Sequence, residues 1–204
     1  MTLYKRREWS FRAWNRMMNQ SRKMIKGCGW IKEAKFGCAH RRLERTFTDL
    51  RSLCSQLLKE GILNGAIENF ARFDPAAKLV ALSAALALYD AGMPYSREKK
   101  QDIGLLGTSP DGALAANLAY FTDYAQAGRK LGRGNLFIYT LPSSPLAEAA
   151  IHFGLQGPLV YVRNKTRPEE ELLAQAESLV SGREAPGMLA VIFNTKEANC
   201  FFIS

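Results

Sequence analysis

The sequence predicts an α/β fold in which a mainly parallel, five-stranded sheet is covered by helices on both faces. Short apolar runs of strand length alternate along the chain with longer segments of helical periodicity, which is typical of parallel sheets. The apolar runs are nearly continuous, as expected for strands buried on both sides. With 204 residues, 47% of them apolar, the chain is long enough for one domain with a proper core.

The first strand is expected at Met24–Trp30, where Gly27 and Gly29 allow a neighbouring backbone to approach closely. The same glycines begin a G-x-G-x-x-G pattern, but its last position is Lys32 and no clean helix follows. A dinucleotide-binding loop is therefore not indicated, and no cofactor is expected. Residues 41–63 then predict a helix, because apolar residues recur at spacings of three and four.

The core helix is expected at residues 74–90. Asp74 is a favourable N-cap residue and Pro75 suits the first helical position, while Gly92 and Pro94 end the helix. Its apolar residues lie on nearly all sides, which is typical of a helix inside the fold.

A buried strand, a turn and a second helix follow the core helix. The apolar run Asp102–Thr108 predicts the strand, SPDG supplies the turn, and residues 113–126 resume helical spacing. The loop GRKLGRG, residues 128–134, holds three basic residues between three glycines. It lacks the P-loop pattern and does not open a helix directly, so a solvated loop is favoured over a phosphate-binding loop.

The stretch Gly134–Val162 is the most specific in the sequence. It predicts an extended run, a loop, a helix that Ser144 caps and Pro145 starts, a stop at Gly154, and a short strand at Leu159–Val162. The alanines of this helix allow it to pack closely against a sheet.

The C-terminal part contributes one helix and two strands. Thr166 and Glu169 form a capping box for a helix that ends near Gly182. Apolar runs at Met188–Phe193 and Asn199–Ile203 predict the last two strands of the sheet.

Positive charge is concentrated in the first third of the chain. The net charge is +9, and residues 1–72 hold sixteen Lys/Arg against six Asp/Glu, whereas the remainder holds twelve against thirteen. Residues 1–23 are expected to be a basic N-terminal extension, helical or disordered, ahead of one domain at residues 24–204. A basic surface raises nucleic acid as a partner, but solvated charge explains the pattern better, so no nucleic-acid partner is expected.

Cysteine usage and hydropathy indicate a cytoplasmic protein. The four cysteines, Cys28, Cys38, Cys54 and Cys200, form no C-x-x-C pair and have no His cluster beside them, which predicts buried, reduced thiols and no metal site. The N-terminus has no apolar segment of the signal-peptide type. The longest apolar run, Leu79–Tyr89, is too short to cross a bilayer, so no transmembrane segment is expected.

Several motifs occur in an order that is characteristic of one family. Along the chain they are MIKGCGW, the helix end Tyr89-Asp90-Ala91-Gly92, the strand Ile103-Gly104-Leu105-Leu106-Gly107-Thr108, the loop Leu141-Pro142, and Gly154-Leu155-Gln156-Gly157-Pro158. In this order they make the chain similar to the N-terminal half of a β-ketoacyl-ACP synthase, a family with the thiolase-like fold. The resemblance covers roughly residues 24–193 and implies that the α/β domain is a thiolase-like half.

The residues after the last motif depart from the family. There, the strand after G-P leads to a catalytic Cys among small residues, at the start of a helix whose dipole favours the thiolate. The equivalent position here is Thr166, which has charged neighbours and is better explained as an N-cap than as a nucleophile. The family's two catalytic histidines lie in its C-terminal half, and His40 and His152 fall outside those motifs. No catalytic residue is therefore expected, and His152 is expected to be a packed or surface histidine.

The resemblance implies a non-catalytic synthase-like subunit, similar to a chain-length factor, in fatty acid, polyketide or polyene biosynthesis. Its partners would be a complete ketosynthase subunit and an acyl carrier protein, in a homo- or heterodimer. In the family, the strand before the nucleophile pairs with its symmetry mate, so the expected interface residues are Leu159, Val160, Tyr161 and Val162. The alternative is an acyl-ACP condensing or acyl-transfer enzyme that a partner chain completes, and a nucleic-acid-binding protein is a third hypothesis.

Overall fold

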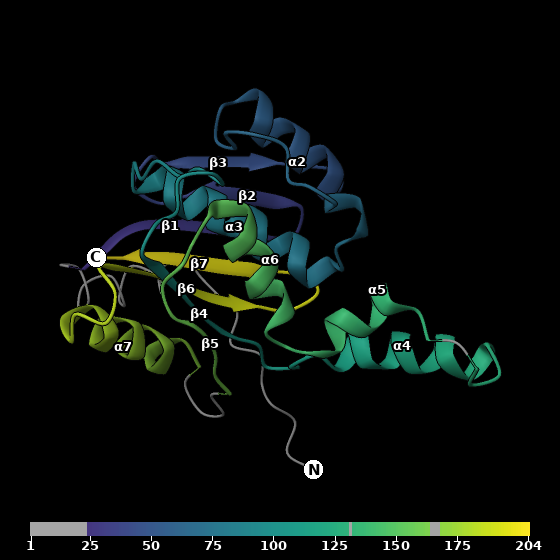
Figure 1. Ribbon diagram of the computed structural model, residues 1–204. Helices are drawn as coiled ribbons and strands as arrows, with labels where there is room; N and C mark the ends of the chain where they lie inside the picture. The colour runs from purple at the N-terminus through teal and green to yellow at the C-terminus, as the bar shows by residue number, and fades with distance from the viewer. Residues whose placement is uncertain (1–23, 131, 164–167) are drawn as a thin grey trace, which may run out of the picture.

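A computed structural model describes residues 24–130, 132–163 and 168–204, and it contains a seven-stranded sheet with helices on both faces (Figure 1). The strands are β1 (Ile25–Lys32), β2 (Lys35–Cys38), β3 (Leu43–Thr46), β4 (Ile103–Thr108), β5 (Leu159–Tyr161), β6 (Gly187–Phe193) and β7 (Ala198–Ile203). The helices are α2 (Leu50–Lys59), α3 (Pro75–Asp90), α4 (Leu114–Gln126), α5 (Gly134–Phe137), α6 (Ser144–Phe153) and α7 (Pro168–Ser181), with short 3-10 helices η1 (Phe70–Arg72) and η2 (Ile138–Thr140). The predicted N-terminal extension, residues 1–23, lies outside the described residues.

The sheet is mixed and seven-stranded, so the prediction of a mainly parallel, five-stranded sheet was wrong. The strand order is β3-β2-β1-β7-β6-β4-β5. Within the described residues, the β4–β5 and β4–β6 pairs are parallel, whereas the β1–β2, β2–β3, β1–β7 and β6–β7 pairs are antiparallel. All five predicted strands are present, but β7 returns beside β6 after a tight turn in which Asn194 N donates to Glu197 O at 3.0 Å. Such a turn can join only antiparallel strands.

The two strands that the sequence analysis missed form an antiparallel meander with β1 at one edge of the sheet. Residues 43–46 lie in β3, within the segment predicted to be helical, and Phe47 N donates to Ala34 O at 2.9 Å. The helix α2 begins only at Leu50, because Asp49 caps it: its Oδ1 accepts from Arg51 N and Ser52 N, both at 2.8 Å.

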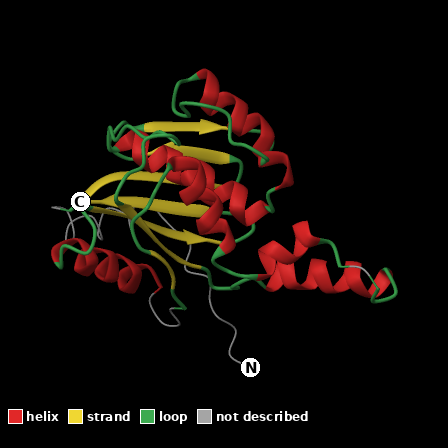
Figure 2. Ribbon diagram, in the orientation of Figure 1, coloured by secondary structure: helices red, strands yellow, loops and turns green. Residues whose placement is uncertain are grey.

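Helices cover the sheet on both faces, as predicted. α3 packs against β1, β7 and β6 on one face and is itself covered by α6 and α2, while α7 packs against β6 and β4 on the other face (Figures 1 and 2). Successive residues of β6 show the two sides, because Leu189 and Val191 belong to the α3 cluster whereas Met188 and Ala190 belong to the α7 cluster.

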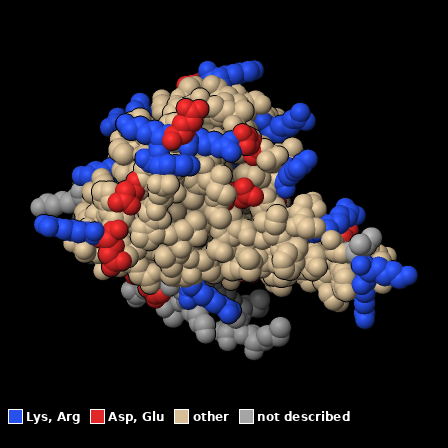
Figure 3. All heavy atoms as spheres, viewed as in Figure 1, with Lys and Arg blue, Asp and Glu red and all other residues tan. Residues whose placement is uncertain are grey.

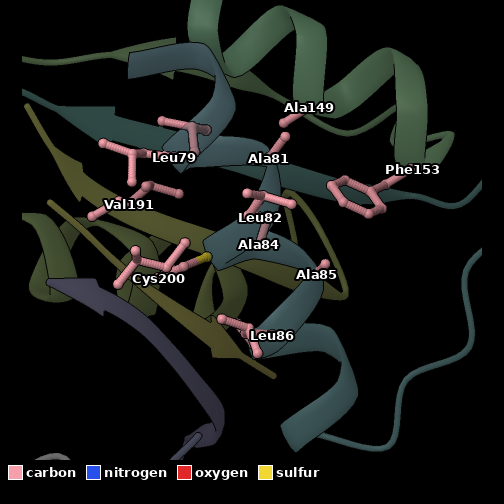
Figure 4. Packing of buried hydrophobic residues seen from close by; sticks show 14 of the residues in the cluster. Leu79, Ala81, Leu82, Ala84, Ala85, Leu86, Ala149, Phe153, Val191 and Cys200 are labelled. Atoms are coloured by element: carbon pink, nitrogen blue, oxygen red, sulfur yellow. The ribbon is translucent and has the colours of Figure 1, made fainter. Parts of the chain in front are cut away.

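The helix α3 is the core helix, as predicted. Its N-cap is Asp74, whose Oδ1 accepts from Ala77 N at 2.7 Å. Figure 4 shows side chains of α6 on one side of α3 and side chains of the sheet on the other, close to the small residues of α3. β1 approaches α3 closely at Gly29, where an added Cβ would lie 2.4 Å from Leu86 Cβ. The glycines of β1 therefore serve close packing.

Asp90, at the C-terminal end of α3, connects the meander to the core through hydrogen bonds. Its carboxylate is buried: Oδ2 accepts from Cys28 N at 2.8 Å and from His40 N at 3.1 Å. Oδ1 accepts from Arg41 N at 2.8 Å, and His40 Nδ1 lies 2.9 Å from Lys26 O. One carboxylate thus pairs three backbone N–H groups of β1 and of the turn that follows β2.

The four cysteines are buried, as predicted, and none of them forms a disulfide within the described residues. Burial raises the pKa of the Cys38 and Cys54 thiols, which disfavours the reactive thiolate. In the described parts of the chain, no helix has the length and hydropathy needed to cross a membrane.

Candidate association surface

β5 is the last strand of the sheet, and among the described residues only β4 pairs with it. On the β4 side, Leu105 N donates to Pro158 O at 2.7 Å and Val162 N donates to Gly107 O at 2.9 Å. Backbone groups alternate between the two sides of a strand, so the N–H groups of residues 159 and 161 point to the open side. They are available to a strand of another chain.

The four predicted interface residues lie together at this edge. Leu159, Val160 and Tyr161 form β5, and Val162 follows it directly. Leu159 and Val160 are 39% and 37% exposed, whereas Tyr161 and Val162 are half-buried. The edge is short and apolar, and none of these four residues is charged.

Two glycines of the G-L-x-G-P motif place β5 against β4. Gly154 ends α6 with a φ of 67°, and an added Cβ there would lie 2.4 Å from Ser96 O. Gly157 lies so close to β4 that an added Cβ would be 2.5 Å from Gly104 N. The motif therefore acts through close backbone approach, and it sets the position of the β5 edge.

The helix before β5 was predicted correctly, but its start was not. Ser144 is the first residue of α6 rather than its cap, and its Oγ donates to Ile138 O. The extended run predicted from Gly134 is also wrong, because those residues form α5 and η2. With no strand beside them to bond, their backbone groups find partners within helical turns.

The position equivalent to the family's nucleophile, Thr166, lies outside the described residues, so its role as an N-cap stays a prediction. α7 begins at Pro168, just after this position. Burial raises the pKa of the Glu169 carboxyl to about 8, and the charge of Glu170 adds to this effect. Glu169 Oε1 is buried without a hydrogen-bond partner in the described part of the chain.

The two histidines lie in separate structural settings. His40 follows β2 and contacts the Asp90 network described above. His152 lies on α6, where its ring packs edge-on against Phe153 at 4.8 Å and lies 6.2 Å from the Tyr95 ring. Burial lowers the pKa of His152, and the nearby charge of Arg97 lowers it further. His152 is therefore packed against its neighbours, one of the two settings predicted for it, and its lowered pKa favours the neutral ring.

A small cavity of about 180 Å³ lies at the carboxyl ends of β4 and β6, between Ala76 of α3 and the start of α4. Its polar lining comes from Ser109, Asp111, Asn194 and Thr195. The described residues hold no group of His, Cys, Asp or Glu side chains that could bind a metal ion.

A second exposed surface was missed by the sequence analysis. We call α4, α5, η2 and Leu141 the arm, because these helices project from the body of the molecule (Figures 1 and 2). The helix α4 was predicted from its apolar spacing, which normally marks a buried face, yet none of its residues is buried. The spacing of apolar residues along α4 does not distinguish an exposed stripe from a buried one.

No protein-family model and no curated protein matches the chain, but solved structures do. A β-ketoacyl synthase from Burkholderia phymatum STM815 is 12% identical, with a TM-score of 0.62 over 89% of this chain and 58% of that one. The ketosynthase ApeO in complex with its chain length factor ApeC, from Xenorhabdus doucetiae, is 15% identical, with a TM-score of 0.56 over 89% and 79%. AntDE:AntF, a type II polyketide synthase acyl-carrier protein in complex with its ketosynthase, is 11% identical, with a TM-score of 0.61 over 89% and 57%.

These similarities show that the chain has the fold of the β-ketoacyl synthases and their chain-length factors, which confirms the resemblance inferred from the motifs. At identities of 11% to 15%, they show the fold alone. The chain spans less than two thirds of the Burkholderia synthase and of the AntDE:AntF ketosynthase.

Proposed function

We propose that the chain is a non-catalytic synthase-like subunit that works by association, in the manner of a chain-length factor. The β5 edge supports this proposal most. Two glycines place β5 against β4, its side chains are apolar, and within the described residues its other side is open to another strand. At the position where the family carries its nucleophile, the sequence has Thr166 among charged residues. The loop, helix and strand that lead to this position are present, whereas the catalytic cysteine of the family is not.

The proposed partners are a complete ketosynthase and an acyl carrier protein. Support comes from two similar structures, one of a ketosynthase with its chain length factor and one of a ketosynthase with an acyl-carrier protein. A carrier protein is acidic, and the first third of this chain carries the excess of positive charge. The biosynthetic setting would be a fatty acid, polyketide or polyene pathway.

The test is complex formation with purified partners. The chain is mixed with each complete ketosynthase and each acyl carrier protein of its own organism, and size-exclusion chromatography with light scattering measures the mass of the complexes. We expect co-elution with a ketosynthase. A chain that binds neither class of protein would contradict the proposal.

A matched pair of proline variants locates the contact. Leu159→Pro removes an N–H on the open side of β5 and leaves the bonds to β4 in place, so we expect it to abolish the ketosynthase complex. Thr46→Pro is the control on the opposite edge, because the bond from Phe47 N to Ala34 O places the N–H of Thr46 on the outer side of β3. It should leave the complex unchanged.

The cavity beside Ser109 favours a second candidate, an acyl-ACP condensing or acyl-transfer enzyme that a partner chain completes. Incubation with malonyl- and acyl-carrier thioesters, with and without the ketosynthase, separates the two functions. Activity that Thr166→Ala removes would support the enzyme. No activity of the chain alone, together with activity of the mixture that Thr166→Ala leaves unchanged, would support the non-catalytic subunit.

A further inference from the structure

Three exposed cationic side chains lie together near the start of β1. Lys26 belongs to β1, whereas Arg41 and Arg42 belong to the turn that follows β2. His40, in the same turn, holds the two segments together, because its Nδ1 lies 2.9 Å from Lys26 O. We call Lys26, Arg41 and Arg42 the basic corner. Figure 3 shows Lys and Arg side chains gathered over the upper part of the molecule, where Figure 1 places the meander and α2.

Buried contacts fix the backbone under the basic corner. The carboxylate of Asp90 accepts hydrogen bonds from His40 N at 3.1 Å and from Arg41 N at 2.8 Å. Arg41 Nε donates to Tyr89 O at 2.8 Å, and the guanidinium lies 4.1 Å from the centroid of the Tyr89 ring. Among the described residues, neither Arg41 nor Arg42 is in an ion pair. Even when the buried carboxylate of Asp90 is counted, the three cations leave the corner positive.

Residues 1–23 join the body of the molecule at the basic corner, and they add to its positive charge. Met24, the first described residue, is fixed just before β1, because its O accepts a hydrogen bond from Ser204 N at 3.0 Å. The 23 residues before it lie outside the described residues. Their sequence holds seven Lys/Arg and one Asp/Glu, so their formal net charge is seven minus one, or +6.

The sequence of this segment is amphipathic. Phe11, Trp14 and Met18 recur at spacings of three and four, so on a helix they would share one face. Arg12 and Arg16 would lie on the opposite side. A cationic pattern with an aromatic face is typical of segments that lie in the headgroup region of a membrane.

From the charge of the corner and the pattern of the segment, we infer that this end of the molecule binds the surface of an anionic phospholipid bilayer. The basic corner and the cations of the segment contact lipid phosphates, and the apolar face of residues 11–18 enters the boundary between headgroups and acyl chains. The inference does not rest on the proposed function. Three strands, β7, β6 and β4, separate β1 from the β5 edge, so a membrane and a ketosynthase can be bound together.

The apolar residues of the segment favour a membrane over nucleic acid as the partner. The phosphates of duplex DNA would attract the cations equally well, because long-range attraction depends on charge. The grooves of a duplex give Phe11, Trp14 and Met18 no apolar medium, whereas the headgroup boundary offers one directly beside the phosphates. A polybasic patch and an apolar anchor are each weak alone, and together they give stable membrane binding.

The arm also exposes apolar side chains, but it lacks this charge. Leu114, Leu118 and Phe121 are 58% to 62% exposed and form a stripe along α4 at helical spacing. The helix α4 contains no Lys or Arg, and its charged residue is Asp123. The arm therefore supplies control positions for the membrane test.

The test is co-sedimentation of the full chain with phosphatidylcholine vesicles, with and without phosphatidylglycerol. We expect binding to the anionic vesicles, which weakens as salt is raised. The double change Lys26→Ala and Arg42→Ala leaves the cation–π contact of Arg41 in place, and it should lower the partition coefficient about 30-fold. Arg129→Ala with Lys130→Ala is the matched control in the exposed loop at the end of α4, and it should change the coefficient less than about threefold. Arg42 and Arg129 also share a positive φ, of 51° and 60°.

A second variant tests the apolar part of the surface. Trp14→Glu places a charge in the apolar face of the segment, and it should lower the partition coefficient at least about 10-fold. Phe121→Glu makes the same kind of change in the stripe of the arm, at a position that is 62% exposed, and it should leave vesicle binding unchanged. Circular dichroism verifies that all variants fold.

Four outcomes would overturn the inference: no binding to phosphatidylglycerol vesicles, equal losses in the corner variant and its control, full binding by Trp14→Glu, or a corner variant that loses DNA or acyl carrier protein but keeps the vesicles. The ketosynthase complex is scored without vesicles, so failure here leaves the proposed function standing. A chain that binds vesicles but no ketosynthase or carrier protein would support the inference and contradict the proposed function.

Discussion

β3 and β5 are the two outer strands of one sheet, and they expose different kinds of side chain. β3 exposes Glu44, Arg45 and Thr46. Two of these are in ion pairs, Glu44 with Lys35 at 3.2 Å and Arg45 with Glu60. Exposed ion pairs of this kind contribute less than about 1 kcal/mol to stability. Their larger effect is on association, because a charged edge resists the addition of another strand.

β5 lacks this protection. It exposes Leu159 and Val160, and the apolar arm stands beside it. β5 is a three-residue strand without charged side chains, whereas the strand at the other edge of the sheet is charged. This difference indicates that the two edges have different functions. The comparison supports the view that β3 ends the sheet and that β5 pairs with a strand of a partner.

The largest expected effect is on the β3 side, from Asp90→Ala. This change leaves three backbone N–H groups without their acceptor, including the buried N–H of Cys28, and we expect a loss of about 4 kcal/mol in the free energy of unfolding. Urea denaturation measures it. Hydrogen exchange should increase more in β2 and β3 than in β5, because Asp90 fastens the meander.

Asp102→Ala is the control for this prediction. Its carboxyl group is exposed just before β4, so the change should stay within about 0.5 kcal/mol. Equal loss of protection in β3 and β5 on Asp90→Ala would contradict the view that the two edges are supported separately.

The second effect is on the β5 side, from Gly157→Ala. The new Cβ would lie 2.5 Å from Gly104 N, so the backbone before β5 must shift, and we expect a loss of about 2 kcal/mol together with weaker binding of the proposed ketosynthase partner. Thermal unfolding and sedimentation measure the two consequences. Gly65→Ala, where nothing lies within 4 Å of the new Cβ, should change neither. Unaltered ketosynthase binding by a destabilised Gly157→Ala variant would separate the association surface from β5.

Sequence patterns were sufficient wherever local chemistry decides the structure. Asp74 and Pro75 mark the start of α3, and its apolar surface on all sides marks it as buried. Gly154 indicates a stop and Gly29 a close approach, and both functions are present in the structure. These residues act through backbone geometry or burial, which a short stretch of sequence reveals.

The parts that failed depend on distant partners. The residues of β3 have a helical spacing of apolar groups, yet they pair with β2 because Asp49 caps the helix later. The direction of β7 depends on the length of one turn, which the hydrophobic pattern does not report. The stripe on α4 has the same periodicity as a buried face, so its exposure at Phe121 follows from what surrounds it. For the site, the β5 edge was predictable and the arm was not.

The third prediction removes the protection of β3. The double change Glu44→Val and Arg45→Leu makes that edge resemble β5, and we expect new, larger species in sedimentation, with a stability change below about 1 kcal/mol. The same exchange in an exposed loop, Glu98→Val with Lys99→Leu, should keep the assembly of the wild type. If neither double variant gains assembly, edge charge is not what distinguishes β3 from β5.

The smallest expected effect is a pH dependence in α6, the helix that packs against β4 and β5. Burial lowers the pKa of His152, the charge of Arg97 lowers it further, and the charge of Glu68 opposes this, while the rings of Tyr95 and Phe153 lie beside the imidazole. The unfolded chain, with a His pKa of about 6.5, binds this proton more readily than the folded chain does. Stability is therefore complete above about pH 6.5 and decreases as the pH falls below it.

His152→Gln keeps a polar side chain on α6 but does not titrate, so its stability should vary less than that of the wild type between about pH 5 and 7.5. This window avoids Glu68, whose pKa is lowered by its hydrogen bond to Arg97 and which therefore titrates at more acidic pH. Urea denaturation at each pH measures the difference. If His152→Gln keeps the slope of the wild type, the acid-sensitive support does not come from His152.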